Sequence, residues 1–88
     1  MVIDTSAILA ILLQEPEAER ITRAIVHAAP RLLSAGTLLE AGIVLGLRHG
    51  SEGARDLDLL LHTLDVSVVS VTEKQANLAR KAYKQFGK

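Results

Sequence analysis

Two acids in this 88-residue sequence stand where carboxylates are uncommon. Asp4 follows the short apolar stretch Met1–Ile3, and Glu40 is the only charged residue between Ala35 and Leu47. A carboxylate inside an apolar segment is costly unless it is paired, bound to a metal or turned toward water. Carboxylate oxygens are the ligands that Mg²⁺ prefers, and the bound ion keeps several of its waters. The two acids are therefore a candidate site for a hard divalent cation.

Whether these two acids lie close together depends on the strands and helices that carry them. The residue types predict a short buried strand over Met1–Ile3, a second strand over Arg31–Ser34, and a helix that carries Glu40 in its first two turns. In an open α/β sheet, active and ligand-binding sites lie outside the carboxyl ends of the strands. If the two strands are parallel, Asp4 and Glu40 converge at that end.

Each acid also has a purely structural explanation, and the residues alone leave both open. Aspartate is a favoured helix cap, so Asp4 could simply cap the helix that follows it. Glu40 could form a capping box with Thr37, or reach solvent at the end of the sheet. No metal-ligand spacing relates the three histidines, which we expect at the surface or at helix ends: His27, His49 and His62.

The remainder of the chain alternates helices with strands. Thr5 or Ser6 can cap a helix that runs to about Leu13, and Pro16 suits the first turn of a second helix that ends near Ala28. The later predicted elements are a helix over 35–48, a helix over 51–64 with Ser51 as its cap and a leucine stripe, a strand over 66–71, and a helix over 72–86. This order predicts a parallel sheet covered by helices.

Composition excludes several classes of protein. There is no cysteine, so disulfide frameworks and thiolate metal sites are ruled out. Ten basic residues balance ten acidic ones, and no basic tail indicates nucleic-acid binding, although a bound metal can supply positive charge locally. The longest apolar run, Ala7–Leu13, is too short to span a bilayer, and Asp4 stands where a signal peptide would be basic. We expect one small, soluble, cytoplasmic domain with no membrane partner.

Three stretches of the sequence resemble one known family. Residues 1–13 (MVIDTSAILAILL) resemble the opening of PIN-domain ribonucleases of the VapC toxin type, and residues 34–45 (SAGTLLEAGIVL) resemble their second acidic motif. Residues 66–71 (VSVVSV) and 75–80 (QANLAR) resemble the stretch that follows in that family. The likeness covers the whole chain in the same order and at the same spacing.

The resemblance implies a Rossmann-like α/β/α fold with a parallel sheet, here of three strands and about five helices. It implies an endoribonuclease dependent on Mg²⁺ or Mn²⁺, with Asp4 as the first acidic ligand and Glu40 as the second. Ser6 matches a hydroxyl that helps to order the loop of the first acid, and Thr5 stands beside it as a second supporting residue. Such proteins act on structured RNA, often tRNA or rRNA, pair with a VapB-like antitoxin and self-associate.

The sequence departs from the family in its length. Members continue for roughly another third of their length, and that part carries a third acid and often a fourth. The last acid here is Glu73, which cannot replace them. We therefore expect residues 1–88 to be a partial PIN domain, truncated at its C-terminal side and weakly active or inactive alone. In the family's sheet, ordered 3-2-1-4-5, the first strand is central, whereas here it would be an open edge.

Two other functions are compatible with the residues. The chain could be a non-catalytic PIN-derived module for dimerisation or antitoxin binding, with the open edge of its first strand as the contact. It could also be a structural fragment of another α/β nucleotide-binding domain, but no Gly-rich loop follows the first strand, which argues against this alternative.

Overall fold

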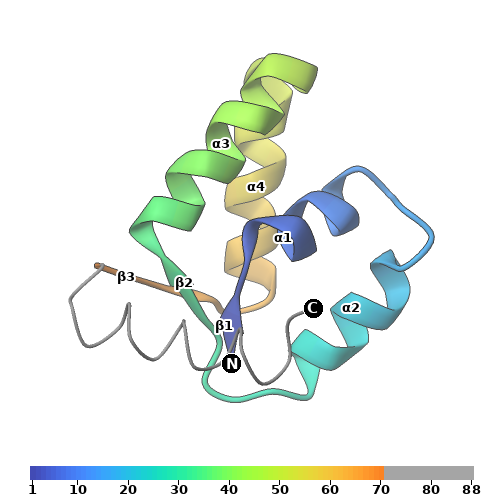
Figure 1. The fold of residues 1–88 in the computed structure, drawn as a ribbon, viewed down its shortest axis with the longest axis vertical. Coiled ribbons are helices and arrows are strands. Elements are labelled where there is room, and N and C mark those ends of the chain that lie inside the picture. The colour runs from blue at the N-terminus through green and yellow to red at the C-terminus, as the bar shows by residue number, and fades with distance from the viewer. Residues whose placement is uncertain (71–88) are drawn as a thin grey trace.

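The computed structural model describes residues 1–70, which form three strands and four helices. In chain order these are β1 (Val2–Ile3), α1 (Thr5–Leu12), α2 (Ala18–Val26), β2 (Leu32–Ser34), α3 (Ala35–His49), α4 (Ser51–Thr63) and β3 (Ser67–Val69). The predicted α/β class and parallel sheet are confirmed (Figure 1). The predicted helix over 72–86 lies outside the described residues. None of the four helices is long and apolar enough to cross a bilayer.

The sheet has the order β1-β2-β3, and every pairing in it is parallel. Ile3 pairs with Leu33, so the chain leaves β1 beside the point where β2 ends at Ser34. Both strands then lead directly into helices, α1 and α3. Because the strands are parallel, the N-terminal ends of these two helices meet at one edge of the sheet. Within residues 1–70, β1 is an edge strand, as the sequence predicted.

The core is aliphatic and draws on every layer of the fold. Its largest fully buried side chains come from α1, α2, β2 and α3, and they are Ile8, Ile25, Leu33 and Leu45. The predicted leucine stripe of α4 is confirmed, since Leu57, Leu61 and Leu64 are buried, with Leu64 just beyond the last turn of the helix. Burying such side chains is the main favourable term in folding a domain this small.

A tight turn at Gly50 folds α3 and α4 into a hairpin that projects beyond the sheet (Figure 1). Gly50 has a φ of +59°, a conformation that glycine adopts readily, and it both ends α3 and begins α4. The two helices approach closely at Gly53, where an added Cβ would lie 2.4 Å from the carbonyl oxygen of Leu45. The position of α3, which carries Glu40, therefore depends on this contact.

Several predicted helix ends are wrong by one or a few residues. Asp4, not Thr5 or Ser6, caps α1, because its carboxylate reaches the backbone N–H of Ala7. Pro16 precedes α2, whose N-cap is Glu17, because the chain first turns at Gln14 with a positive φ.

The other two errors lie at the end of α2 and the start of α4. The helix α2 ends at Val26 rather than near Ala28. Ser51 is the first residue of α4 and not its cap, because Gly50 already occupies that position.

Candidate functional site

Asp4 lies at the carboxyl end of β1 and is the N-cap of α1. Its Oδ1 accepts hydrogen bonds from the Ser6 hydroxyl at 2.8 Å and from the Ala7 backbone N–H at 2.9 Å. The capping explanation for Asp4 is therefore correct, and it uses one oxygen of the carboxylate. Among residues 1–70, no hydrogen bond engages Oδ2.

Glu40 lies exposed on α3, and its Oε1 accepts a hydrogen bond from the Thr5 hydroxyl. A capping box with Thr37 is wrong, because Thr37 is itself inside α3. Ser34 caps that helix, and its Oγ accepts from the Thr37 N–H at 3.0 Å. Like Asp4, Glu40 has one carboxylate oxygen held by a neighbour, and no hydrogen bond within the described range reaches the other.

The Thr5–Glu40 hydrogen bond joins residues 35 positions apart in the chain. Thr5 directly follows Asp4, so this one bond brings the segment of the first acid to the second acid. The convergence of the two segments at the carboxyl edge of the sheet agrees with the parallel topology. Asp4 is the N-cap of α1, where negative charge is favoured, and Glu40 lies in the second turn of α3. The sequence singled out Thr5 only as a hydroxyl beside the first acid, and nothing in it indicated the contact with Glu40.

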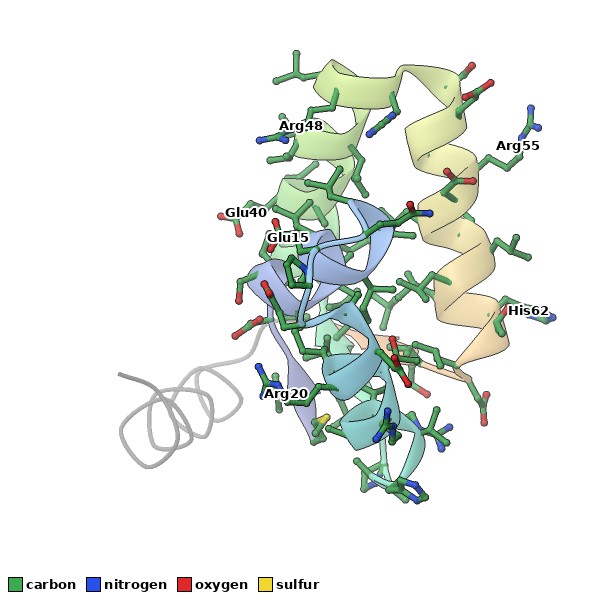
Figure 2. The ribbon with its side chains drawn as sticks, turned by 90° about the vertical axis from the view of Figure 1, so that its right-hand side faces the viewer. Glu15, Arg20, Glu40, Arg48, Arg55 and His62 are labelled. Carbon is green, nitrogen blue, oxygen red and sulfur yellow. The ribbon has the colours of Figure 1, made fainter. Side chains whose placement is uncertain are left out.

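The candidate ligand set within residues 1–70 is a pair of carboxylates. No group of three or more histidine, cysteine, aspartate or glutamate side chains in that range could hold a metal ion together. The three histidines are exposed, as the sequence predicted: His27, His49 and His62. Figure 2 shows His62 on α4, pointing away from Glu40. Two carboxylates suit Mg²⁺, which is commonly bound through one or two carboxylates with waters and substrate phosphates as its other ligands.

A second acidic pair lies in the turn between α1 and α2. A side-chain hydrogen bond with Glu17 raises the pKa of Glu15 and lowers the pKa of Glu17, and the positive charge of Arg48 opposes the rise at Glu15. Arg48 is in the last turn of α3, and α1 packs against α3, which brings the segment after α1 near Arg48. Glu15, Glu40 and Arg48 are labelled in Figure 2. Nothing in the residue pattern indicated that Glu15 and Glu17 would interact.

Comparison with known proteins gives consistent matches along the whole chain. The family model described as PIN domain matches residues 1–88. A protein named Ribonuclease VapC from Mycolicibacterium smegmatis is 47% identical over 88 residues, which are 100% of this chain and 68% of that protein. Ribonuclease VapC30 from Mycobacterium tuberculosis is also 47% identical, with 67% of its length covered, and Ribonuclease VapC28 from the same species is 46% identical, with 66% covered.

Proposed function

The chain belongs to the PIN-domain family, and from this premise we propose that it is a divalent-metal-dependent ribonuclease that hydrolyses RNA phosphodiester bonds. The observation that supports this most directly is the Thr5–Glu40 hydrogen bond, which brings the segment that carries Asp4 to Glu40 at the carboxyl end of a parallel sheet. Asp4 and Glu40 are each held through one oxygen and present the other. The names of the relatives support RNA as the substrate.

The two acids would hold Mg²⁺ or Mn²⁺. The donor set fits these ions, because both prefer oxygen ligands and accept waters and phosphate oxygens at their remaining positions. Ser6 and the Ala7 N–H orient the carboxylate of Asp4, and Thr5 orients that of Glu40. Hydrogen bonds of this kind fix the direction of metal ligands and affect metal affinity. Asp4 and Glu40 are thus the proposed ligands, with Thr5 and Ser6 in support.

An ion held by Asp4 and Glu40 would supply activation of a water and would offset negative charge on the phosphate in phosphodiester hydrolysis. The contribution of this chain is electrostatic and geometric. Asp4 places negative charge at the N-cap of α1, and Glu40 places it on the second turn of α3. Their hydroxyl partners keep each carboxylate from rotating, so little reorganisation is needed when substrate binds.

We propose residues 1–88 as the part of a PIN domain that supplies the first two acids. The chain spans about two thirds of the relatives named above. The resemblance assigns a third and a fourth acid to the additional part of such proteins. It also supports structured RNA of the tRNA or rRNA class as substrate, a VapB-like antitoxin as partner, self-association, and action in the cytoplasm.

Metal binding and RNA cleavage test this function together. Mn²⁺ binding is measured by titration calorimetry for the wild-type chain and for Asp4→Asn and Glu40→Gln. Either substitution should weaken binding by about 10-fold or more, since each removes one of two charged ligands. Asp58→Asn, which changes an exposed acid on α4, is the matched control and should have no effect.

Cleavage of a fluorophore–quencher RNA in Mg²⁺, Mn²⁺ or EDTA completes the test. Any cleavage should require the metal and both acids, at a low rate if the site needs further ligands. Cleavage that persists in EDTA, or Mn²⁺ binding unaffected by both substitutions, would overturn the proposal. A chain that binds no metal but self-associates would favour the second candidate, a non-catalytic PIN-derived module for dimerisation or antitoxin binding. The edge position of β1 is the observation that favours that candidate.

A further inference from the structure

The arginines of residues 1–70 divide into two that are bound within the fold and three that are not. Arg31 donates to three backbone carbonyl oxygens, and Arg23 forms an ion pair with Glu19 at 2.6 Å. In that range, no side-chain hydrogen bond or ion pair engages the other three, which are exposed: Arg20, Arg48 and Arg55. Such a guanidinium is available to an anion, and arginine binds phosphate through two parallel hydrogen bonds.

Two of these three arginines lie on the side of the molecule that carries Glu40. In the view of Figure 2, Glu40 lies between Arg48 and Arg20 on one side. Arg55 points away on the opposite side. Arg20 belongs to α2 and Arg48 to α3, and both helices pack against α1, whose N-cap is Asp4. The face that presents the two acids therefore also presents two arginines.

The relation of Arg48 to Glu40 follows from the geometry of α3. The two residues lie on the ridge that runs through every fourth residue of the helix, separated by about 12 Å along its axis. Val44 is half-buried at the midpoint of this ridge, so no charged group lies between them on it. Successive phosphates of a nucleic-acid strand are only a few ångströms apart. A strand with one phosphate at Glu40 therefore has another within reach of Arg48.

We propose that Arg48 and Arg20 bind phosphates of the RNA backbone and so position the strand across Asp4 and Glu40. The inference rests on the proposed function, because it takes RNA as the substrate. Contacts of this kind position the backbone and carry no sequence information. They also offset the repulsion between the RNA and the two carboxylates, which a chain with a formal net charge of zero does not reduce by its overall charge.

Each of the two arginines lies near an acid in the turn between α1 and α2. The hydrogen bond between Glu15 and Glu17 raises the pKa of the first and lowers the pKa of the second. To a smaller extent, the positive charge of Arg48 lowers the pKa of Glu15. The charge of Arg20 likewise lowers the pKa of Glu17. A phosphate that binds either arginine must therefore compete with a nearby carboxylate.

Fluorescence anisotropy of the full chain with a labelled RNA hairpin tests the two contacts. The titrations are made in EDTA, so neither metal binding nor cleavage affects them. Arg48→Gln and Arg20→Gln should each weaken binding by about 5-fold or more, and each should reduce the slope of log K against log salt by about 0.7–0.9. Arg55→Gln is the matched control and should change neither quantity. Circular dichroism checks that the variants fold.

Two further substitutions separate a phosphate contact from a structural role. Arg48→Lys keeps the charge, so it should keep the salt slope and recover part of the affinity, although an ammonium cannot reproduce the planar fork. Glu15→Gln should strengthen binding by about 2- to 5-fold, since it removes the negative charge near Arg48. A second RNA of unrelated sequence should give the same ratios between variants.

Equal effects of Arg48→Gln and Arg55→Gln would overturn the proposal, as would an unchanged salt slope in the variants of Arg48 and Arg20 or a wild-type chain that binds no RNA. Failure of the metal site gives a different pattern. Mn²⁺ binding would then not respond to Asp4→Asn or Glu40→Gln, while the arginine variants would still lose RNA affinity in EDTA. That pattern would support the phosphate contacts and contradict the metal-dependent ribonuclease.

Discussion

The hydroxyl of Thr5 donates a hydrogen bond to Oε1 of Glu40 and so connects the first turn of α1 with the second turn of α3. Glu40 is exposed, and a glutamate on a helix surface normally samples several rotamers. The bond with Thr5 restricts it to the rotamers that face Asp4's end of the sheet. A hydroxyl adjacent to the first acid thus positions the second acid.

Replacing Thr5 should therefore weaken metal binding without removing a ligand. Thr5→Val keeps the shape of the side chain and removes the donor, so Mn²⁺ affinity should fall by about 10-fold, within the range for partners of metal ligands. Thr5→Ser keeps the hydroxyl donor, so this variant should keep most of the wild-type affinity for Mn²⁺. If Thr5→Val binds Mn²⁺ as the wild type does while its stability is unchanged, Thr5 does not position Glu40.

Asp4 has a capping role and a proposed ligand role, and two substitutions separate them. Asparagine is as good a cap as aspartate, so Asp4→Asn should change the free energy of unfolding by less than about 0.5 kcal/mol. Asp4→Ala removes the acceptor for Ser6 and the Ala7 N–H and should cost about 1 kcal/mol. Both variants should bind Mn²⁺ about 10-fold more weakly or worse. Urea unfolding and calorimetry provide the two measurements, and an Asp4→Asn variant that still binds Mn²⁺ normally would make Asp4 a cap alone.

The sequence predicted the order of the elements, the parallel sheet and the leucine stripe of α4, because these follow from residue type and periodicity. It left the cap of α1 open, since Asp4, Thr5 and Ser6 can all cap a helix. The choice depends on where β1 ends, and that is set by its pairing with β2.

Contacts between polar side chains that are far apart in the sequence could not be predicted from residue type and periodicity either. The Thr5–Glu40 bond spans 35 positions, and the bond from Arg31 to Leu64 spans 33. Such contacts depend on how helices pack, and no local preference encodes them. They include the bond that positions the second acid, which is why the sequence could propose the acids but not their geometry.

Arg31 should be among the most important polar residues for stability. Its guanidinium donates to the backbone carbonyl oxygens of Ile25 at 2.8 Å, Val26 at 2.7 Å and Leu64 at 2.8 Å, which joins the C-terminal ends of α2 and α4. Arg31→Ala should lower the free energy of unfolding by about 3 kcal/mol, because hydrogen bonds from charged donors are stronger than neutral ones. Arg31→Lys should recover part of this loss, since an ammonium cannot reproduce the planar fork.

The control for Arg31 is Arg23→Ala. Arg23 pairs with Glu19 at 2.6 Å on the exposed surface of α2, and pairs of this kind contribute less than about 1 kcal/mol. Urea unfolding of the three variants gives the comparison. Equal losses for Arg31→Ala and Arg23→Ala would contradict a special role for Arg31.

Two glycines of the α3–α4 hairpin should respond in opposite directions to alanine. Gly53→Ala would place a Cβ 2.4 Å from the Leu45 carbonyl oxygen, so the helices must separate, at a cost of about 2 kcal/mol. Gly46→Ala meets nothing within 4 Å and should stabilise the helix by about 0.5–1 kcal/mol. Thermal unfolding measures both. A neutral Gly53→Ala would mean that the hairpin can open without loss.

The Glu15–Glu17 pair should give the chain a distinctive dependence on pH. The hydrogen bond between them raises the pKa of Glu15 above 4.5, so its stabilising contribution is present below pH 4.5 and is lost as the pH rises through the raised value. The same bond lowers the pKa of Glu17, whose contribution is present above pH 4.5 and is lost as the pH falls through the lowered value. The pair is therefore most stabilising near pH 4.5, where Glu15 is protonated and Glu17 is ionised.

Glu15→Gln should remove the pH dependence of the free energy of unfolding that Glu15 causes above about pH 4.5. The glutamine amide can donate to Glu17 at any pH, so the hydrogen bond no longer requires a proton on residue 15. The free energy of unfolding of the variant should therefore rise relative to that of the wild type between about pH 4.5 and pH 7. The effect should be small, because both side chains are in contact with water and screened. Urea unfolding at several pH values measures it, with Asp58→Asn as a control that should show no such slope. A variant that instead loses stability relative to the wild type as the pH rises would show that Glu15 is not the proton donor of the pair.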